Sequence, residues 1–163
     1  MPVRTEALLR TTPAIWSDGY LAFGAGRNVL GSTNIEAALA FFGPRFIAPT
    51  LSGHGTHELL VTPDALREID QDAGYRALVQ LLRNEVRMFS TATVDSAVLE
   101  NLARMFFQEM GPSLIYSNTV VYPASGNGEC LGPWYGVTRH TADTLICAIN
   151  ETCVAYWLYG DDE

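Results

Sequence analysis

Apolar residues recur with helical spacing in two central segments of the chain. In each segment four of them stand at positions i, i+3, i+4 and i+7: Tyr75, Leu78, Val79 and Leu82 in the first, and Leu99, Leu102, Ala103 and Phe106 in the second. Residues with this spacing share one face of a helix. The pattern predicts helices over residues 72–84 and after Asp95, a suitable N-cap, with Gly111 and Pro112 ending the second helix.

Capping signals predict a further helix over residues 34–42. Thr33 and Glu36 match a capping box, in which each side chain satisfies a backbone donor that the helix leaves free. Gly43 followed by Pro44 provides the stop.

Two more helices are expected near the start and the middle of the chain. Residues 5–10 can form a short one. Thr62 can cap another, with Pro63 at its first position and Gly74 interrupting it. Three acidic residues at i, i+4 and i+8 can then share one helical face, which we interpret as a solvated face: Asp64, Glu68 and Asp72.

Strands are predicted where apolar runs are rich in β-branched and aromatic residues. These runs are residues 19–25, 57–61 and 114–122, and two C-terminal strands on either side of Asn150 and Glu151. Helices in the middle and strands at the end, without regular β-α-β alternation, predict an α+β fold. We expect a single domain over residues 1–163, with a mainly antiparallel sheet covered on one face by about three helices.

Charge narrows the range of partners. The chain holds ten arginines and eighteen acidic side chains, a formal net charge of −8. Residues 111–163, with six acids and one arginine, account for −5 of it. Because binding to nucleic acid or to an anionic membrane requires clustered cations, we expect neither as a partner.

The cysteines and the N-terminal segment indicate a compartment. Three cysteines without a CxxC pair are typical of reduced thiols rather than of a disulfide framework. Cys147 and Cys153 flank the predicted hairpin turn, and they lie opposite each other under a three-residue turn but are offset under a two-residue turn. The first residues include Glu6 and lack the apolar stretch of a signal peptide, so we expect a cytoplasmic protein.

Three residues have the types that a thiol triad requires. In such a site an imidazole lowers the pKa of the thiol and a carboxylate orients the ring, roles open to Cys130, His140 and Asp143. Glu129 opposes this, because a neighbouring negative charge raises the pKa of a thiol. The glycine-rich segment 125–136 also suits the binding of a small molecule.

Metal and cofactor motifs are not matched. Gly24, Gly26 and Gly31 have neither the spacing of a dinucleotide fingerprint nor that of a P-loop. His54 and His57 lack the order of a zinc-protease helix. We expect no metal and no cofactor.

The C-terminal third combines acidic and aromatic residues in the mixture found at protein interfaces. The predicted partner-binding residues are Trp134, Tyr135, Trp157, Tyr159, Asp161, Asp162 and Glu163. The alternative for these aromatics is a place in the core. Our first hypothesis is a small acidic module that binds a basic protein, most concretely an immunity-type inhibitor of a cationic toxin such as a nuclease. The second is a thiol-dependent or hydrolytic enzyme using Cys130, His140 and Asp143.

Overall fold

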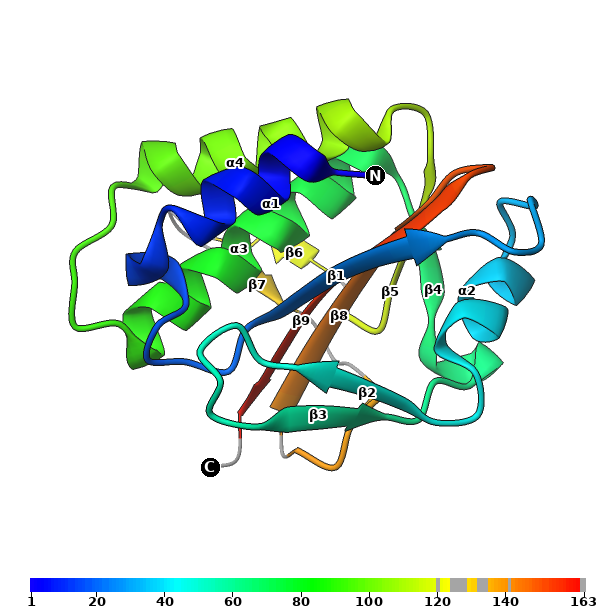
Figure 1. Cartoon of the computed structure of the whole chain (residues 1–163), viewed down its shortest axis with the longest axis horizontal. Coiled ribbons are helices and arrows are strands. Elements are labelled where there is room, and N and C mark those ends of the chain that lie inside the picture. Colours follow the sequence, from blue (N-terminus) through cyan, green and yellow to red (C-terminus); the bar gives the residue numbers. More distant parts are fainter. Residues whose placement is uncertain (120, 124–128, 132–134, 141, 162–163) are drawn as a thin grey trace.

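A five-stranded antiparallel sheet runs through the middle of the molecule in the computed structural model (Figure 1). The structure describes residues 1–119, 121–123, 129–131, 135–140 and 142–161. The strand order is β1-β9-β8-β5-β4, with bounds β1 Ala22–Arg27, β4 Arg67–Ile69, β5 Leu114–Ser117, β8 Ala142–Ile149 and β9 Cys153–Asp161. The strands β1 and β4 are therefore the two edges of the sheet.

Helices cover one face of this sheet (Figure 1): α1 Val3–Arg10, α3 Gln71–Phe89 and α4 Ser96–Met110. Their apolar stripes pack against Ile115, Ile146 and Trp157 in one continuous core. The carboxylate of Glu109 in α4 accepts hydrogen bonds from the N–H groups of Arg4 and Thr5, both at 2.7 Å. A side chain from another helix thus caps the N-terminus of α1, where free backbone donors attract a negative charge.

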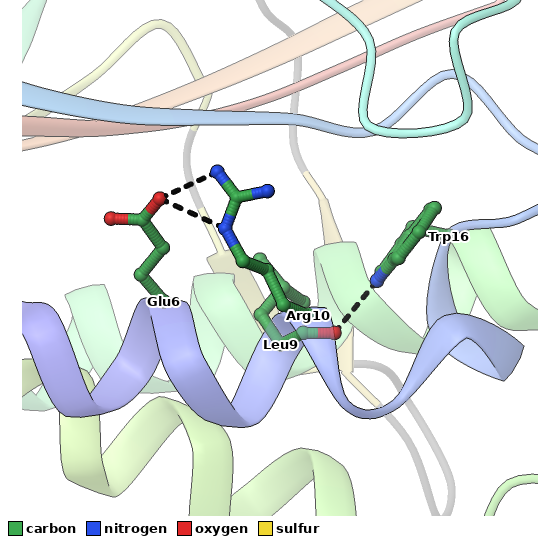
Figure 2. A network of polar contacts seen from close by, with 4 residues as sticks. All are labelled: Glu6, Leu9, Arg10 and Trp16. Carbon is green, nitrogen blue, oxygen red and sulfur yellow. Dashed lines mark hydrogen bonds and ion pairs between the residues drawn. The ribbon is translucent and has the colours of Figure 1, made fainter.

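The C-terminal end of α1 is held by the segment that follows it (Figure 2). The indole N–H of Trp16 donates to the carbonyl of Leu9 at 2.7 Å. Glu6 and Arg10 form an i, i+4 ion pair at 2.7 Å along the helix. Trp16 directly follows the 3-10 turn η1 Pro13–Ile15, so these contacts fix the path of the chain toward β1.

The second face of the sheet is covered by α2 Ile35–Phe42 and by the hairpin of β2 Phe46–Pro49 and β3 Thr56–Leu59. The ring of Tyr156 in β9 lies 5.7 Å from that of Phe42 and 5.5 Å from that of Phe46, centroid to centroid. The predicted α+β fold with a mainly antiparallel sheet is confirmed. The structure adds that the sheet is covered on both faces, which places most of its side chains in a core.

The glycines of β1 make room for these rings. A Cβ at Gly24 would lie 2.7 Å from ring atoms of Tyr156, and one at Gly26 would lie 2.7 Å from the ring of Phe41. Both distances are shorter than van der Waals contact. The glycine-rich segment therefore serves strand packing.

The helix predicted after Pro63 is wrong. The segment forms the 3-10 turn η2 Pro63–Ala65, then the short edge strand β4, and α3 begins only after its N-cap Asp70. The three acids Asp64, Glu68 and Asp72 consequently lie on three different elements. Gly74 lies inside α3 and does not interrupt it. Ile115 packs against this glycine, and a Cβ there would lie 2.9 Å from the Ile115 side chain. Pairing with β5 thus overrides the local helix signal.

The predicted ends of two helices have different outcomes. Asp95 caps α4, its carboxylate accepting from the N–H of Ala97 at 2.9 Å, and Gly111 ends the helix with φ +63°. For α2 the N-cap is Asn34 instead of Thr33, without a side-chain capping hydrogen bond. The stop at Gly43, with φ +61°, is as predicted.

The β8–β9 hairpin closes with a two-residue turn, Glu151 and Thr152, one position later than the expected Asn150 and Glu151. Asn150 lies opposite Cys153, joined by a hydrogen bond of 3.0 Å from the Asn150 N–H to the Cys153 carbonyl. Cys147 lies opposite Tyr156 and belongs to the core on the α2 side, whereas Cys153 belongs to the core on the α3 side. Both thiols are free and buried, and their positions on opposite faces exclude a bond between them.

The strands β6 Val121–Pro123 and β7 Glu129–Leu131 form a separate hairpin in which Cys130 pairs with Tyr122. The backbone of Cys130 thus lies in a short strand, where a loop was expected. Within the described ranges no helix combines the length and the apolar character that a membrane span requires.

Candidate partner-binding surface

A buried amide and a buried carboxylate meet at the end of β5. Asn118 and Asp143 are 3 % and 2 % exposed, and the side-chain amide of Asn118 donates to Oδ1 of Asp143 at 2.6 Å. The same amide donates to the carbonyl of Tyr135 at 2.8 Å, while its oxygen accepts the N–H of Leu145 at 2.7 Å. The N–H of Tyr135 donates to the Asn118 carbonyl at 3.1 Å. Asn118 therefore forms hydrogen bonds with both the N–H and the carbonyl of Tyr135.

The carboxylate of Asp143 holds the residues that follow Tyr135. It accepts hydrogen bonds from the N–H of Val137 at 3.0 Å, from the N–H of Thr138 at 2.8 Å and from the Thr138 hydroxyl at 2.6 Å. Hydrogen bonds to a charged acceptor are stronger than neutral ones. Residues 135–138 are thus fixed to the sheet by two buried side chains.

The residue whose backbone is fixed in this way, Tyr135, has an exposed aromatic side chain. Tyr135 is 54 % exposed, and the guanidinium of Arg67 lies 5.5 Å from the centroid of its ring. Arg67 and the neighbouring Glu68 are both exposed on the edge strand β4. We define the Tyr135 surface as Arg67, Glu68 and Tyr135.

Acidic side chains lie on and before the edge strand β4. Burial raises the pKa of Tyr116, and the negative charges of Glu68 and Glu36 raise it further. Glu68 lies directly opposite Tyr116 in the β4–β5 register, and Glu36 lies on α2. Asp64 is exposed in η2, just before β4. The region beside the Tyr135 surface is therefore acidic.

Two members of the predicted thiol triad are described in full, and their contacts differ from those of a triad. Asp143 directs its carboxylate to Asn118, Val137 and Thr138, and none of its hydrogen bonds within the described residues reaches the ring of His140. Nε2 of His140 lies 2.7 Å from Nδ1 of His57 instead. The side chain of Cys130 lies outside the described part of the chain.

Sequence reasoning missed this pairing of His57 with His140. His57 is 1 % exposed on β3, and its Nε2 donates to the carbonyl of Tyr20. Because a carbonyl only accepts, a neutral His57 must carry its proton on Nε2, and its Nδ1 then accepts from His140. The next peptide N–H, that of Leu21, donates to the fully buried carboxylate of Glu85 at 3.2 Å.

The absence of a side chain at Gly160 makes room for the two imidazole rings. A Cβ at Gly160 would lie 2.8 Å from the ring of His140 and 3.2 Å from the ring of His57. The two histidines are 83 positions apart in the sequence, so no local pattern joins them. The requirement for Gly160 becomes visible only in the folded chain.

For two of the predicted partner-binding aromatics, the alternative of a place in the core is correct. Trp157 is 0 % exposed and Tyr159 is 8 % exposed, and both belong to the core under the helices. The reason is that both faces of the sheet are covered. Tyr135 is exposed as predicted. Trp134, Asp162 and Glu163 lie outside the described residues, and of Asp161 the structure describes the backbone at the end of β9.

Within the described residues there is no group of three or more His, Cys, Asp or Glu side chains that could hold a metal ion. Compared with protein-family models, with curated proteins and with solved structures, the chain shows no significant match.

Proposed function

We propose that this protein is a small acidic module that binds a basic protein partner through the Tyr135 surface. The observation that carries the proposal is the fixed position of Tyr135: its ring is exposed, the buried Asn118 bonds to its backbone, and the buried Asp143 bonds to Asn118 and to residues 137 and 138. A rigid aromatic side chain loses little conformational entropy on binding, which suits it to anchor an interface.

Charge supports a basic partner. The chain has a net charge of −8, and the exposed carboxylates of Glu36, Asp64 and Glu68 lie on α2, η2 and β4, with Glu68 next in sequence to the Arg67 that contacts Tyr135. Complementary charge accelerates encounter and selects against acidic partners. In its most concrete form the module is an immunity-type inhibitor that covers the cationic cleft of a toxin, such as a nuclease, with carboxylates in place of phosphates.

The free thiols of Cys147 and Cys153 favour a reducing compartment, so the proposal includes a cytoplasmic location. A thiol-dependent enzyme receives less support, because Asp143 already holds residues 137 and 138 and its carboxylate makes no described contact with the His140 ring.

The test is capture of partners on the immobilised full chain, followed by mass spectrometry and by kinetics on the purified captured protein. Tyr135→Ala should raise the dissociation rate by a factor that corresponds to about 2 kcal/mol, the cost of removing an aromatic anchor. Met88→Ala, which truncates a half-exposed apolar side chain on α3, is the matched control and should leave binding unchanged. Added salt should slow association.

Two results would contradict the proposal. One is a captured protein that is acidic and binds independently of salt. The other is a basic protein that binds Tyr135→Ala as tightly as the unaltered chain, since its site then lies elsewhere.

A further inference from the structure

The outer edge of β1 carries backbone groups whose direction follows from one hydrogen bond. The N–H of Asn28 donates to the carbonyl of Thr152 at 3.0 Å, in the register that pairs β1 with β9. Along an antiparallel strand the polar groups of successive residues point to opposite sides. Even-numbered residues of β1 therefore bond to β9, and Phe23, Ala25 and Arg27 direct their N–H and C=O groups outward.

The neighbouring Leu21 confirms this direction and closes one end of the edge. Its N–H donates to Glu85 at 3.2 Å, and its carbonyl accepts the N–H of Leu51 at 2.8 Å. By contrast, no hydrogen bond joins the outward groups of Phe23, Ala25 or Arg27 to any other described residue. As far as the described residues show, three donors and three acceptors are thus left open along this edge.

The opposite edge of the sheet is built differently. The Asn118 N–H donates to the Leu145 carbonyl, so alternation along β5 leaves Glu68 as the one residue of β4 whose polar groups point outward. The strand has three residues and exposes Arg67 and Glu68, which is how edge strands avoid pairing. In the six residues of β1 the single charged side chain is Arg27, and two residues are glycines.

We propose that β1 pairs antiparallel with β1 of a second copy of this chain, about a two-fold axis at Ala25. The pairing joins two five-stranded sheets into one. In this register each outward N–H meets an outward carbonyl of the other copy, three from each chain and six in all. No outward group on Phe23, Ala25 or Arg27 is left unpaired.

The side chains fit a second copy because the register is self-complementary. Arg27 lies opposite Phe23 of the second copy, an arrangement that allows a cation–π contact on one face of the new sheet. Gly24 lies opposite Gly26 of the second copy on the other face, where the absence of side chains lets the backbones approach. Ala25 faces itself.

Exposed apolar residues follow the end of this edge. Val29 and Leu30 follow β1 directly and are 72 % and 54 % exposed. The chain bends at these two residues, where Oδ1 of Asn28 accepts the N–H groups of Leu30 and Gly31, so the proposed ladder ends at Arg27 of one copy and before Leu21 of the other, whose carbonyl is bonded to Leu51. Two exposed apolar side chains therefore flank each end of the proposed interface.

The proposal is independent of the function proposed for the Tyr135 surface. Because β1 and β4 are opposite edges of the sheet, pairing through β1 leaves β4 and Arg67 at the two outer ends of the dimer. Each dimer then presents two partner sites.

The decisive experiment measures the mass of the full chain by sedimentation equilibrium from micromolar to submillimolar concentration. The unaltered chain should reach twice the mass of one copy. Ala25→Pro removes an outward N–H and leaves the ladder to β9 intact, which is how proline is tolerated in edge strands, and it should give one copy throughout. Glu68→Pro makes the same change at the outward N–H of β4 and should still dimerise.

Amide hydrogen exchange on the unaltered chain tests the register without a substitution. The N–H groups of Phe23, Ala25 and Arg27 should become protected as concentration rises, whereas those of Gly24 and Gly26 should be protected throughout. A chain that stays monomeric at every concentration overturns the proposal. A dimer in which the three outward amides stay unprotected also overturns it. So does protection of these amides that appears only when another protein is added.

Discussion

The molecule contains two buried polar clusters that have different structural roles. The cluster of Asn118 and Asp143 lies beside the β4 edge and ends outward, in a fixed backbone that exposes Tyr135. The cluster of His57 and His140 runs inward, through the Tyr20–Leu21 peptide, to the buried carboxylate of Glu85. The first cluster positions a surface, whereas the second ties β3, α3 and the segment before β1 together.

The difference shows how to interpret a buried polar group. Such a group needs hydrogen-bond partners wherever it lies, so burial and satisfaction alone do not mark a functional site. What separates the clusters is the exposed end: a half-exposed aromatic side chain in one and a fully buried carboxylate in the other. Substitutions can break each cluster separately.

Asp143→Ala should have the largest effect on stability. It removes the acceptor of two backbone N–H groups, one hydroxyl and one amide, all near the end of β5. Leaving several buried donors unsatisfied costs about 3 kcal/mol in the free energy of unfolding. Urea unfolding measures it, with Asp95→Ala, which removes one exposed helix cap, as the control expected to lose about 1 kcal/mol. Equal losses in the two variants would contradict the role given to Asp143.

His57→Phe should break the second cluster with a smaller loss. The phenyl ring fills the site but leaves the Tyr20 carbonyl and Nε2 of His140 without the imidazole. We expect a loss of about 2 kcal/mol in the free energy of unfolding and no change in partner binding. His54→Phe, at an exposed position in the β2–β3 turn, should change stability by less than about 0.5 kcal/mol. If the His57→Phe variant is fully folded but binds the partner more weakly, the two clusters are functionally connected.

Glu109→Gln tests a polar contact outside both clusters, the cap at the N-terminus of α1, and serves as a reference for their effects on stability. Burial raises the pKa of Glu109, but hydrogen bonds from Thr5 and Arg4 outweigh it and leave the pKa below its ordinary value of 4.5. A lowered pKa in the folded state stabilises the fold above pH 4.5, and this contribution disappears as the pH falls through the folded-state pKa. Glu109→Gln should therefore lose about 1 kcal/mol at pH 7 and converge with the unaltered chain in acid. Thermal melting at both pH values measures it, and a constant difference would exclude the charge as the cause.

Tyr135→Ala should change stability least among these substitutions. The side chain is 54 % exposed, and Asn118 holds the residue by its backbone, which alanine retains. The expected change in the free energy of unfolding is within about 0.5 kcal/mol, while partner binding is lost as described above. A large destabilisation would show that the ring supports the fold, and would remove the argument for an anchor.

Alkylation of the native chain should leave stability unchanged and label Cys130 first. Cys147 and Cys153 are buried, and burial raises the pKa of both thiols, so their reactive thiolate forms are suppressed. Mass mapping after brief treatment with iodoacetamide measures the order. Labelling of Cys147 at the same rate as Cys130 would indicate that the sheet opens on that timescale.

The sequence alone determined the elements whose signals are local. The apolar spacing around Leu78 and Leu102 places α3 and α4, and Asp95 and Gly111 mark ends that the structure shares. Such signals work because helix periodicity and capping involve residues within four positions of each other. The net charge was likewise available from the residues.

Only the tertiary structure decided which of these residues are buried and which meet. Pro63 carries a helix signal, yet pairing with β5 turns the segment into an edge strand, and covering both faces of the sheet buries Trp157. His57 reaches His140 across 83 positions because β3 packs beside Gly160. Strand register and layer packing are set by contacts between distant parts of the chain, and such contacts leave no periodicity in any single segment.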